Sequence, residues 1–306
     1  MRTDRFIPVM LSAAFLAVCF TQSGTAAEPT VKLTQKDSNV EVSIDGNLFT
    51  VLNFSKEQRK PYFHPVNGPD GTFISRPLEN PSDHPHHKGL WFSVDEVNKS
   101  RHWMERSPIE PGEVKILQAE GNPAKLEMTS IWKADDGRDL LSEKTTVSIF
   151  ANRLIIYDAI LKAEKEPVEF EDTKEGMFAF RFRDELREKV GGHVSNADGL
   201  QTTKECWGKE SDWVDYYGTV EGTTAGVALF DHPLNFHRSR YHVRDYGLFA
   251  INPFGQHAYT NGALPKDPIH LPTGTFVRLR YGAYIHSGNT DEGKVKEAYQ
   301  QFLKNS

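Results

Sequence analysis

Apolar and polar residues alternate with a period of two along most of this chain, which limits the folds that it can adopt. Val40, Val42 and Ile44 alternate with polar residues, and residues 178–182 repeat the pattern with phenylalanines. Successive side chains of a β-strand point to opposite faces of a sheet, so this pattern indicates strands with one buried face. The chain is therefore predicted to consist mainly of β-strands.

The strand candidates follow one another at nearly regular spacing. Asp-Gly-Asn at 45–47 is a turn sequence that predicts a β-hairpin over residues 40–52. The other predicted strands are 114–117, 124–132, 140–150, 154–161, 178–182, 227–230, 248–251 and 276–286. Many short strands joined by turns favour an antiparallel sandwich or barrel. Since no repeat, linker or charge block divides the chain, residues 28–306 are predicted to form a single domain.

One segment near the C-terminus has the period of an amphipathic helix. Val295, Ala298, Tyr299 and Phe302 fall on one helical face, and Asp291 can cap the first turn. An apolar helical face needs a partner surface, so this helix is predicted to dock on a sheet.

The N-terminus predicts an export signal. Arg2 and Arg5 precede an apolar stretch over residues 6–20, which is followed by small residues. This stretch is shorter than the roughly 20 residues of a membrane-spanning helix, so a signal peptide over residues 1–27 is favoured over an anchor. Lipidation of Cys19 is an open alternative. The mature protein is predicted to be periplasmic or secreted, without stable membrane insertion.

Composition and missing motifs exclude several classes of function. The 306 residues include 36 Lys and Arg and 42 Asp and Glu, which gives a formal charge of -6 and argues against a nucleic-acid binder. The sequence has no Walker loop, dinucleotide fingerprint, G-x-S-x-G elbow or H-E-x-x-H motif. Without the signal peptide only Cys206 remains, so neither an internal disulfide nor a multi-cysteine metal site is expected.

A histidine cluster in residues 83–91 is the first segment that suggests chemistry. In an extended chain His84 and His86 face one side and His87 faces the other. Two imidazoles on one side provide half of a site for a divalent metal such as zinc, calcium or copper, which His232 or a carboxylate can complete. The alternative is that one histidine contacts a ligand while the others bind buried backbone groups.

Three further segments carry polar and aromatic residues suited to a site. Glu175 lies at a strand entry beside Gly176, where a ligand can approach closely, and it can act as a general base. Residues 230–247 combine three His, three Arg and two Asp with aromatics, which suits a polar or hydroxylated ligand. The aromatics in residues 207–217 either stack on sugars or pack in the core.

Four motifs together resemble the DUF6807 family. They are DHPHHKGLWF at 83–92, DTKEGMF at 172–178, FDHP at 230–233 and HVRDYGLFAINPFG at 242–255. This family is also catalogued under the label methane oxygenase PmoA, and it offers no established activity to carry over. A membrane oxygenase subunit needs several spanning helices, and the sequence has no such segment after its signal. The resemblance implies an all-β antiparallel sandwich of the galactose-mutarotase-like supersandwich type.

These observations favour an exported carbohydrate-active enzyme that hydrolyses, β-eliminates or epimerises a sugar. Such reactions need a base, an acid and a cation for developing charge, with Glu175 as the base and His86 or His242 as the acid. The residues predicted to bind a carbohydrate or other small polar substrate are His87, Lys88, Trp91, Trp103, Asp172, Arg238, Arg244, Asp245 and Asn252. The alternatives are a metal-dependent enzyme at the histidine cluster and a non-catalytic glycan-binding module.

The three polar segments are predicted to meet in one pocket. Residues 84–88, 172–175 and 232–245 each lack a full catalytic set, but together they offer a base, an acid, cations and metal ligands. Because strand ends from distant parts of a chain can meet on one face of a sandwich, we expect the fold to bring them together.

Overall fold

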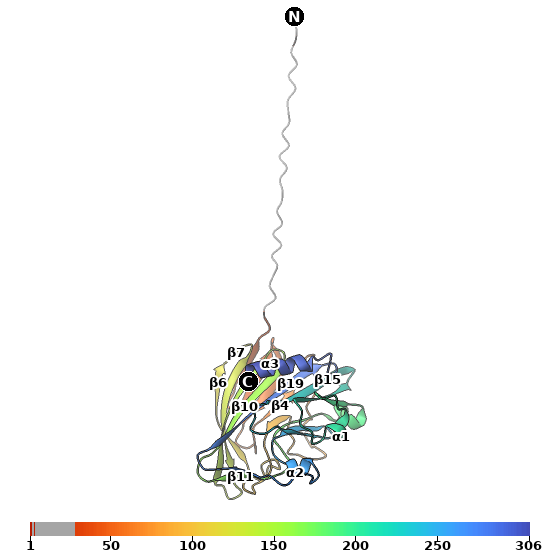
Figure 1. Ribbon diagram of the computed structural model, residues 1–306. Helices are drawn as coiled ribbons and strands as arrows, with labels where there is room; N and C mark the ends of the chain where they lie inside the picture. Colours follow the sequence, from red (N-terminus) through yellow and green to blue (C-terminus); the bar gives the residue numbers. More distant parts are fainter. Residues whose placement is uncertain (2, 4–27) are drawn as a thin grey trace.

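Two antiparallel β-sheets pack face to face in the computed structural model, which describes residues 1, 3 and 28–306 (Figure 1). The nine-stranded sheet has the order β16 (Arg240–Val243), β17 (Leu248–Asn252), β12 (Phe178–Arg181), β5 (Leu90–Phe92), β4 (Tyr62–Val66), β3 (Asn47–Asn53), β2 (Asn39–Ile44), β1 (Val31–Gln35) and β7 (Glu120–Gly121). The predicted antiparallel sandwich is thereby confirmed. The predicted signal peptide lies outside the described residues, apart from Met1 and Thr3.

The second sheet has eight strands and carries the longest of them. Its order is β13 (His193–Asn196), β14 (Trp213–Val220), β15 (Thr223–Asp231), β19 (Phe276–Ser287), β10 (Leu154–Ala163), β9 (Asp139–Ile149), β8 (Ala124–Lys133) and β6 (Ile109–Gln118). A separate pair is formed by β11 (Val168–Phe170) and β18 (Ile269–Leu271). The short helical elements are two 3₁₀ turns at Asp184–Leu186 and Glu188–Val190, α1 (Thr202–Cys206) and α2 (Gln256–Tyr259).

The period-two alternation of the sequence separates the two faces of each strand. In β8 every second residue is fully buried, and its buried residues Leu126 and Trp132 belong to the core between the sheets. In β12 Phe178 and Phe180 enter the same core, whereas Ala179 joins a smaller cluster on the outer face of the nine-stranded sheet. The core therefore holds the sheets together and leaves this outer face for other groups.

The C-terminal helix α3 (Val295–Asn305) covers the outer face of the eight-stranded sheet (Figure 1). Val295, Ala298 and Phe302 pack there, as the sequence predicts. The predicted cap is wrong, because the residue before the helix is Lys294 and no side chain caps it. Asp291 instead accepts a hydrogen bond from Lys294 N through its backbone oxygen, in a turn that precedes the helix. None of the helices among the described residues is long and apolar enough to cross a membrane.

Candidate functional site

A row of side chains crosses the outer face of the nine-stranded sheet. Register partners in β4, β5, β12, β17 and β16 form it in the order Tyr62, Trp91, Ala179, Ala250 and His242. Because two alanines separate large rings, the row has a depression at its centre. The Trp103 side chain, from the loop after β5, packs over the alanines and is buried. Its ring centroid lies 5.1 Å from that of Trp91 and 6.5 Å from that of His242.

Filling the depression should displace Trp103. We expect Ala179→Leu to lower the free energy of unfolding by about 1–3 kcal/mol, because added methylenes in a packed site force side chains and backbone to shift. Tryptophan emission should also move to longer wavelength as the Trp103 indole gains solvent. Ala197→Leu, at an exposed position, is the matched control. An Ala179→Leu protein with unchanged stability and emission would contradict this packing.

The histidine cluster contributes two rings to a continuous aromatic stack on this face. The His84 ring stacks on Tyr246, with centroids 5.3 Å apart, and on His87, with centroids 4.7 Å apart. The His87 ring in turn stacks on Trp91 at 5.4 Å. His87 and Trp91 are buried, whereas the His84 side chain keeps 42% of its surface exposed. The stack therefore leads from the sheet to solvent and ends on His84 and Tyr246.

Two arginines hold this stack in place. The guanidinium of Arg181, the outward-facing residue at the end of β12, donates to His87 Nδ1 at 3.1 Å and to Asp83 Oδ1 at 2.9 Å. Arg76 also donates to Asp83, at 2.5 Å. Burial opposes the charge of Asp83, but the two guanidinium groups outweigh it and lower the pKa of that carboxyl group. His87 is neutral, because burial and the charges of His86 and Arg181 lower its pKa.

His86 lies beside a buried ion cluster. Its backbone oxygen accepts a hydrogen bond from Lys60 Nζ at 2.7 Å, and Lys60 and Lys88 share the Glu105 carboxylate at 2.8 and 3.2 Å. Burial lowers the pKa of Lys60 to about 8. Burial and the charge of Lys60 lower the pKa of His86 to about 4, so this imidazole is uncharged near neutral pH. The predicted substrate contact Lys88 is therefore engaged with Glu105.

Glu175 lies on the same face as the stack, close to His242. Its Oε2 atom is 3.7 Å from His242 Nδ1, and a quarter of its side chain is exposed. Burial, with repulsion from Asp95, raises the pKa of Glu175 against the opposing charges of Lys174 and Arg244. A carboxylate with a raised pKa is a stronger base than an ordinary surface glutamate. Glu175 can therefore accept a proton from a group bound on this face.

His242 is fixed in one neutral tautomer. Its Nδ1 atom lies 3.0 Å from Lys174 O, which can only accept, and its Nε2 atom lies 3.1 Å from Arg244 Nε, which can only donate. The proton therefore resides on Nδ1. Burial and the charge of Arg244 lower the pKa of His242 well below its ordinary value. With both nitrogens engaged, His242 positions the loop of Glu175 and the guanidinium of Arg244.

Arg244 presents its guanidinium beside an aromatic ring. The guanidinium carbon lies 3.9 Å from the centroid of the Trp207 ring, and Trp207 also contacts His242 edge-on. Arg244 Nε is bound by His242, and the terminal nitrogens make no ion pair with a carboxylate among the described residues. They are therefore available to a negatively charged or strongly polar oxygen of a ligand.

Two of the predicted binding residues support this face without facing it. Asp172 accepts hydrogen bonds from the backbone nitrogens of His257 and Asp267 and so secures α2. Asn252 is fully buried and donates to Thr173 O at 2.9 Å. Both interactions fasten the loop that carries Glu175 to its surroundings.

Two of the other predicted residues lie away from this face, and one lies at its edge. Arg238 pairs with Asp212 at 2.9 Å, whereas Asp245 is exposed and lines a cavity together with Arg244 and Trp207. His232 contacts Phe302 of α3, on the outer face of the opposite sheet, so it does not join His84 and His86. Nowhere in residues 28–306 are three His, Cys, Asp or Glu side chains grouped as metal ligands. Residues 84–88, Glu175 and residues 242–244 thus lie on one face, where Trp103 links His87 to His242, while residues 232–238 lie apart.

Some residues of the site were not singled out from the sequence. Arg181, Tyr246, Asp83 and Glu105 all belong to the contacts described above. The sequence could have identified Arg181 as a residue of this face. The alternation in residues 178–182 places it on the same side of the strand as Ala179, opposite the phenylalanines. A strand arginine that is nearly fully buried needs a carboxylate partner, here Asp83.

Solved structures that resemble this chain include several sugar-active proteins. A β-arabinopyranosidase matches with a TM-score of 0.36 and 12% identity over 85% of this chain, which spans 38% of that protein. Galactose 1-epimerase from Lactobacillus acidophilus matches with a TM-score of 0.42 and 8% identity over 85% of this chain and 98% of that one. A GalM/aldose epimerase homologue from C. elegans has a TM-score of 0.42 and 7% identity, over 86% and 100% of the two chains. Their sugar chemistry is a property of those proteins.

The sequence of this chain matches a protein family. No curated protein matches the chain. A match to the family described as "Family of unknown function (DUF6807)" covers residues 39–300, which include every strand of the two sheets except β1 and all the residues of the face described above. The chain therefore belongs to the DUF6807 family.

Proposed function

We propose that this protein is an exported enzyme that acts on a carbohydrate by acid–base chemistry on the outer face of the nine-stranded sheet. The observation that carries the proposal is the Glu175 carboxylate, which has a raised pKa and lies 3.7 Å from the fixed, neutral His242. Export is supported by the signal-like residues 1–27, and the exported protein should begin near Glu28 on N-terminal sequencing.

Glu175 is the proposed base. Hydrolysis, β-elimination and epimerisation of a sugar each begin with removal of a proton from water, an O–H or a C–H group, and Glu175 accepts that proton. Negative charge then develops on the substrate, and the terminal nitrogens of Arg244, whose Nε binds His242, are the proposed donors to that charge. Stabilisation of such charge by a fixed donor is one of the largest contributions to enzymatic rate.

We assign the proton donor to His84. His242 has both nitrogens engaged, and His86 is uncharged near neutral pH, which weakens both as acids. His84 is the exposed histidine of the stack, and its Nδ1 atom lies 3.4 Å from Asp83 Oδ1. A carboxylate beside one ring nitrogen orients the imidazole, which leaves Nε2 of His84 to face a substrate.

Aromatic rings on both sides of these polar groups support a sugar as the ligand. Tyr246 continues the stack beyond His84, and Trp207 lies beside Arg244 on the other side. Both rings are partly exposed. The apolar face of a sugar ring packs on such aromatics while its hydroxyl groups reach polar side chains, as in small-molecule sites generally.

The test is incubation of the purified protein with a panel of oligosaccharides that includes neutral sugars and uronates. Proton NMR distinguishes a new reducing end, an unsaturated sugar and an epimer, which report hydrolysis, elimination and epimerisation. Appearance of one of these products is the expected result. Binding of panel members without any product would show a glycan-binding module instead. If no panel member binds and no product forms, the assignment to carbohydrates is refuted.

A further inference from the structure

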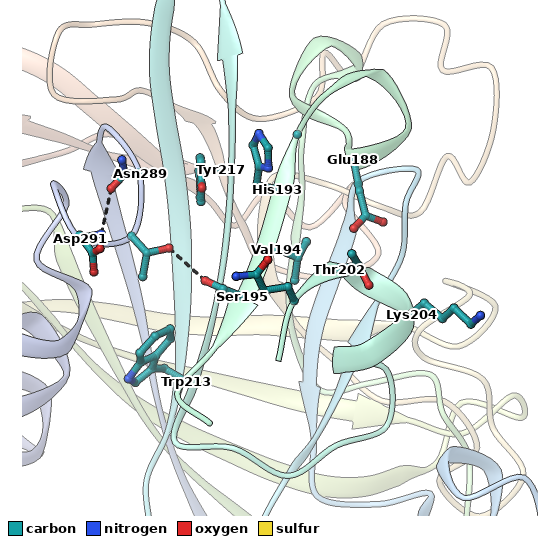
Figure 2. A pocket seen from close by; sticks show the side chains of 13 residues that line it. Glu188, His193, Val194, Ser195, Thr202, Lys204, Trp213, Tyr217, Asn289 and Asp291 are labelled. Carbon is teal, nitrogen blue, oxygen red and sulfur yellow. Dashed lines mark hydrogen bonds between the residues drawn. The ribbon is translucent and has the colours of Figure 1, made fainter. Parts of the chain in front are cut away.

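We propose that a second cavity, at the edge of the eight-stranded sheet, binds a neutral oligosaccharide. The cavity has a volume of about 780 Å³ and lies between β13, β14, α1 and the loop after β19 (Figure 2). The proposal does not depend on the reaction proposed above, because none of the acid–base residues lines this cavity.

One wall of the cavity is aromatic. In β14 the residues Val214 and Tyr216 enter the core, so Trp213 and Tyr217 face the opposite way and line the cavity. His193 is the register partner of Tyr217, and their rings stack with centroids 5.1 Å apart (Figure 2). The aromatic residues at 207–217 therefore divide between the core and two surface sites. Partly exposed rings of this kind offer apolar faces for sugar C–H groups.

The remaining lining groups suit hydroxyl groups. Ser195 and Thr202 provide hydroxyl groups, and Asn289 and Asp291 lie across from Ser195 (Figure 2). Gln201 adds an amide group to the lining. This set combines donors and acceptors, as a polyhydroxylated ligand requires.

The charges in the cavity favour a neutral ligand. Glu188 is engaged by Thr203, whose backbone nitrogen and hydroxyl both donate to its carboxylate. Lys204 and Asp291 carry opposite charges, and no ion pair commits either to a partner among the described residues. The two carboxylates and one ammonium leave an excess of a single negative charge, and Thr203 already binds one of the carboxylates. The cavity therefore has no cluster of one sign that would select an anion or a cation.

A buried network fixes the rim. Thr290 Oγ1 donates to Asp215 Oδ2 at 2.7 Å, and Ser195 Oγ lies 3.0 Å from Thr290 Oγ1. Asp215 is fully buried and pairs with the buried His286 at 2.8 Å. This network ties the loop that carries Asn289 to β13 and β14. A binding site held before the ligand arrives loses less entropy on binding.

Sequence details support the network. A Cβ atom at Gly226 would lie 2.7 Å from His286 Nε2, and one at Gly293 would lie 2.3 Å from Nδ1. Only glycine fits at both positions while His286 keeps its place. In addition, Asn289 Oδ1 accepts from the backbone nitrogen of Asp291 at 3.0 Å, which leaves the amide nitrogen of Asn289 for a ligand.

The cavity continues toward the candidate site, which favours a chain over a single sugar. Glu188 and Lys204 also line a neighbouring cavity of about 410 Å³, whose other lining residues include Trp207 and Arg244. Two adjacent cavities that share lining residues can hold successive units of one oligosaccharide. We therefore expect a hexasaccharide to bind more tightly than the corresponding monosaccharide.

The experiment is isothermal titration of the full mature chain with cellohexaose, xylohexaose, mannohexaose and the matching monosaccharides. At least one hexasaccharide should bind, and Tyr217→Ala should weaken it roughly tenfold, as expected for loss of one aromatic contact. Gln201→Ala should also weaken hexasaccharide binding. Because Gln201 is exposed, this variant tests the same cavity if Tyr217→Ala fails to fold. Phe276→Ala, an exposed aromatic of the same sheet, is the matched control and should have no effect.

A parallel titration of Glu175→Gln separates this cavity from the proposed reaction. Binding that persists in Glu175→Gln and weakens in Tyr217→Ala supports the cavity, even if no turnover is ever found. The proposal is overturned if none of the three hexasaccharides binds, or if binding survives both Tyr217→Ala and Gln201→Ala.

Discussion

Glu175→Gln should lower kcat/KM for the sugar substrate by about 10²- to 10⁴-fold, which is the usual contribution of a general base. Glutamine keeps the shape of the side chain but cannot accept the proton. Because the group is partly exposed and makes no strong ion pair, the thermal midpoint should change little. The wild-type rate should also fall as the pH drops through the raised pKa of Glu175, since only the carboxylate is active.

Glu171→Gln is the matched control for this prediction. Glu171 lies in the same loop and its pKa is also raised, by burial and by repulsion from Glu169, but it does not contact His242. Its replacement should leave the rate within a few-fold of wild type. If Glu175→Gln retained most of the activity, or if Glu171→Gln lost as much, Glu175 would not be the base.

Asp215→Ala should lower the free energy of unfolding by about 3–5 kcal/mol, the usual cost of removing one partner from a buried ion pair. Asp215 and His286 are both buried, with 2.8 Å between Oδ1 and Nε2. His286 Nδ1 also lies 3.2 Å from Ser287 O, so the ring donates from both nitrogens and carries a charge. Without Asp215 that charge would be buried alone. Urea unfolding followed by circular dichroism measures the loss.

The loss should depend on pH in a defined direction. Burial opposes the charge of His286, but Asp215 outweighs it and raises the pKa above the ordinary value of 6.5. A histidine whose pKa is higher in the folded state than in the unfolded state stabilises the fold. This contribution is complete at a pH below the pKa of the unfolded state, and it is lost as the pH rises through the pKa of the folded state. The difference between wild type and Asp215→Ala should therefore be larger near pH 6 than near pH 9.

Asp158→Ala provides the control for the buried pair. Asp158 pairs with Arg278 on the same sheet at 2.8 Å, but about half of the arginine side chain is exposed. Exposed pairs contribute about 0–1 kcal/mol, so this variant should remain close to wild type. Equal losses in the two variants, or no pH dependence for Asp215→Ala, would mean that His286 is not held as a cation.

Local pattern was enough to predict the strands and the class of fold. The segments that alternate at 40–44 and 178–182 form β2 and β12 in the structure. The predicted apolar face of Val295, Ala298 and Phe302 is the face of α3 that packs on the sheet. These features are set by the period of side chains along one element. The predicted cap of α3 was wrong, because the helix begins after a turn that is closed by backbone hydrogen bonds, and the side chain of Asp291 does not cap it.

The sequence by itself also determined which segments hold polar groups able to do chemistry, since residues such as His84, Glu175 and Arg244 stand out against an apolar strand pattern. Only the tertiary structure decided which of them meet. Strand order places β5, β12, β17 and β16 side by side, which brings Glu175 to His242 and leaves His232 with α3 on the other sheet. The reason is that pairing between distant strands depends on how the whole chain packs, and nothing in a single segment records which strand will become its neighbour.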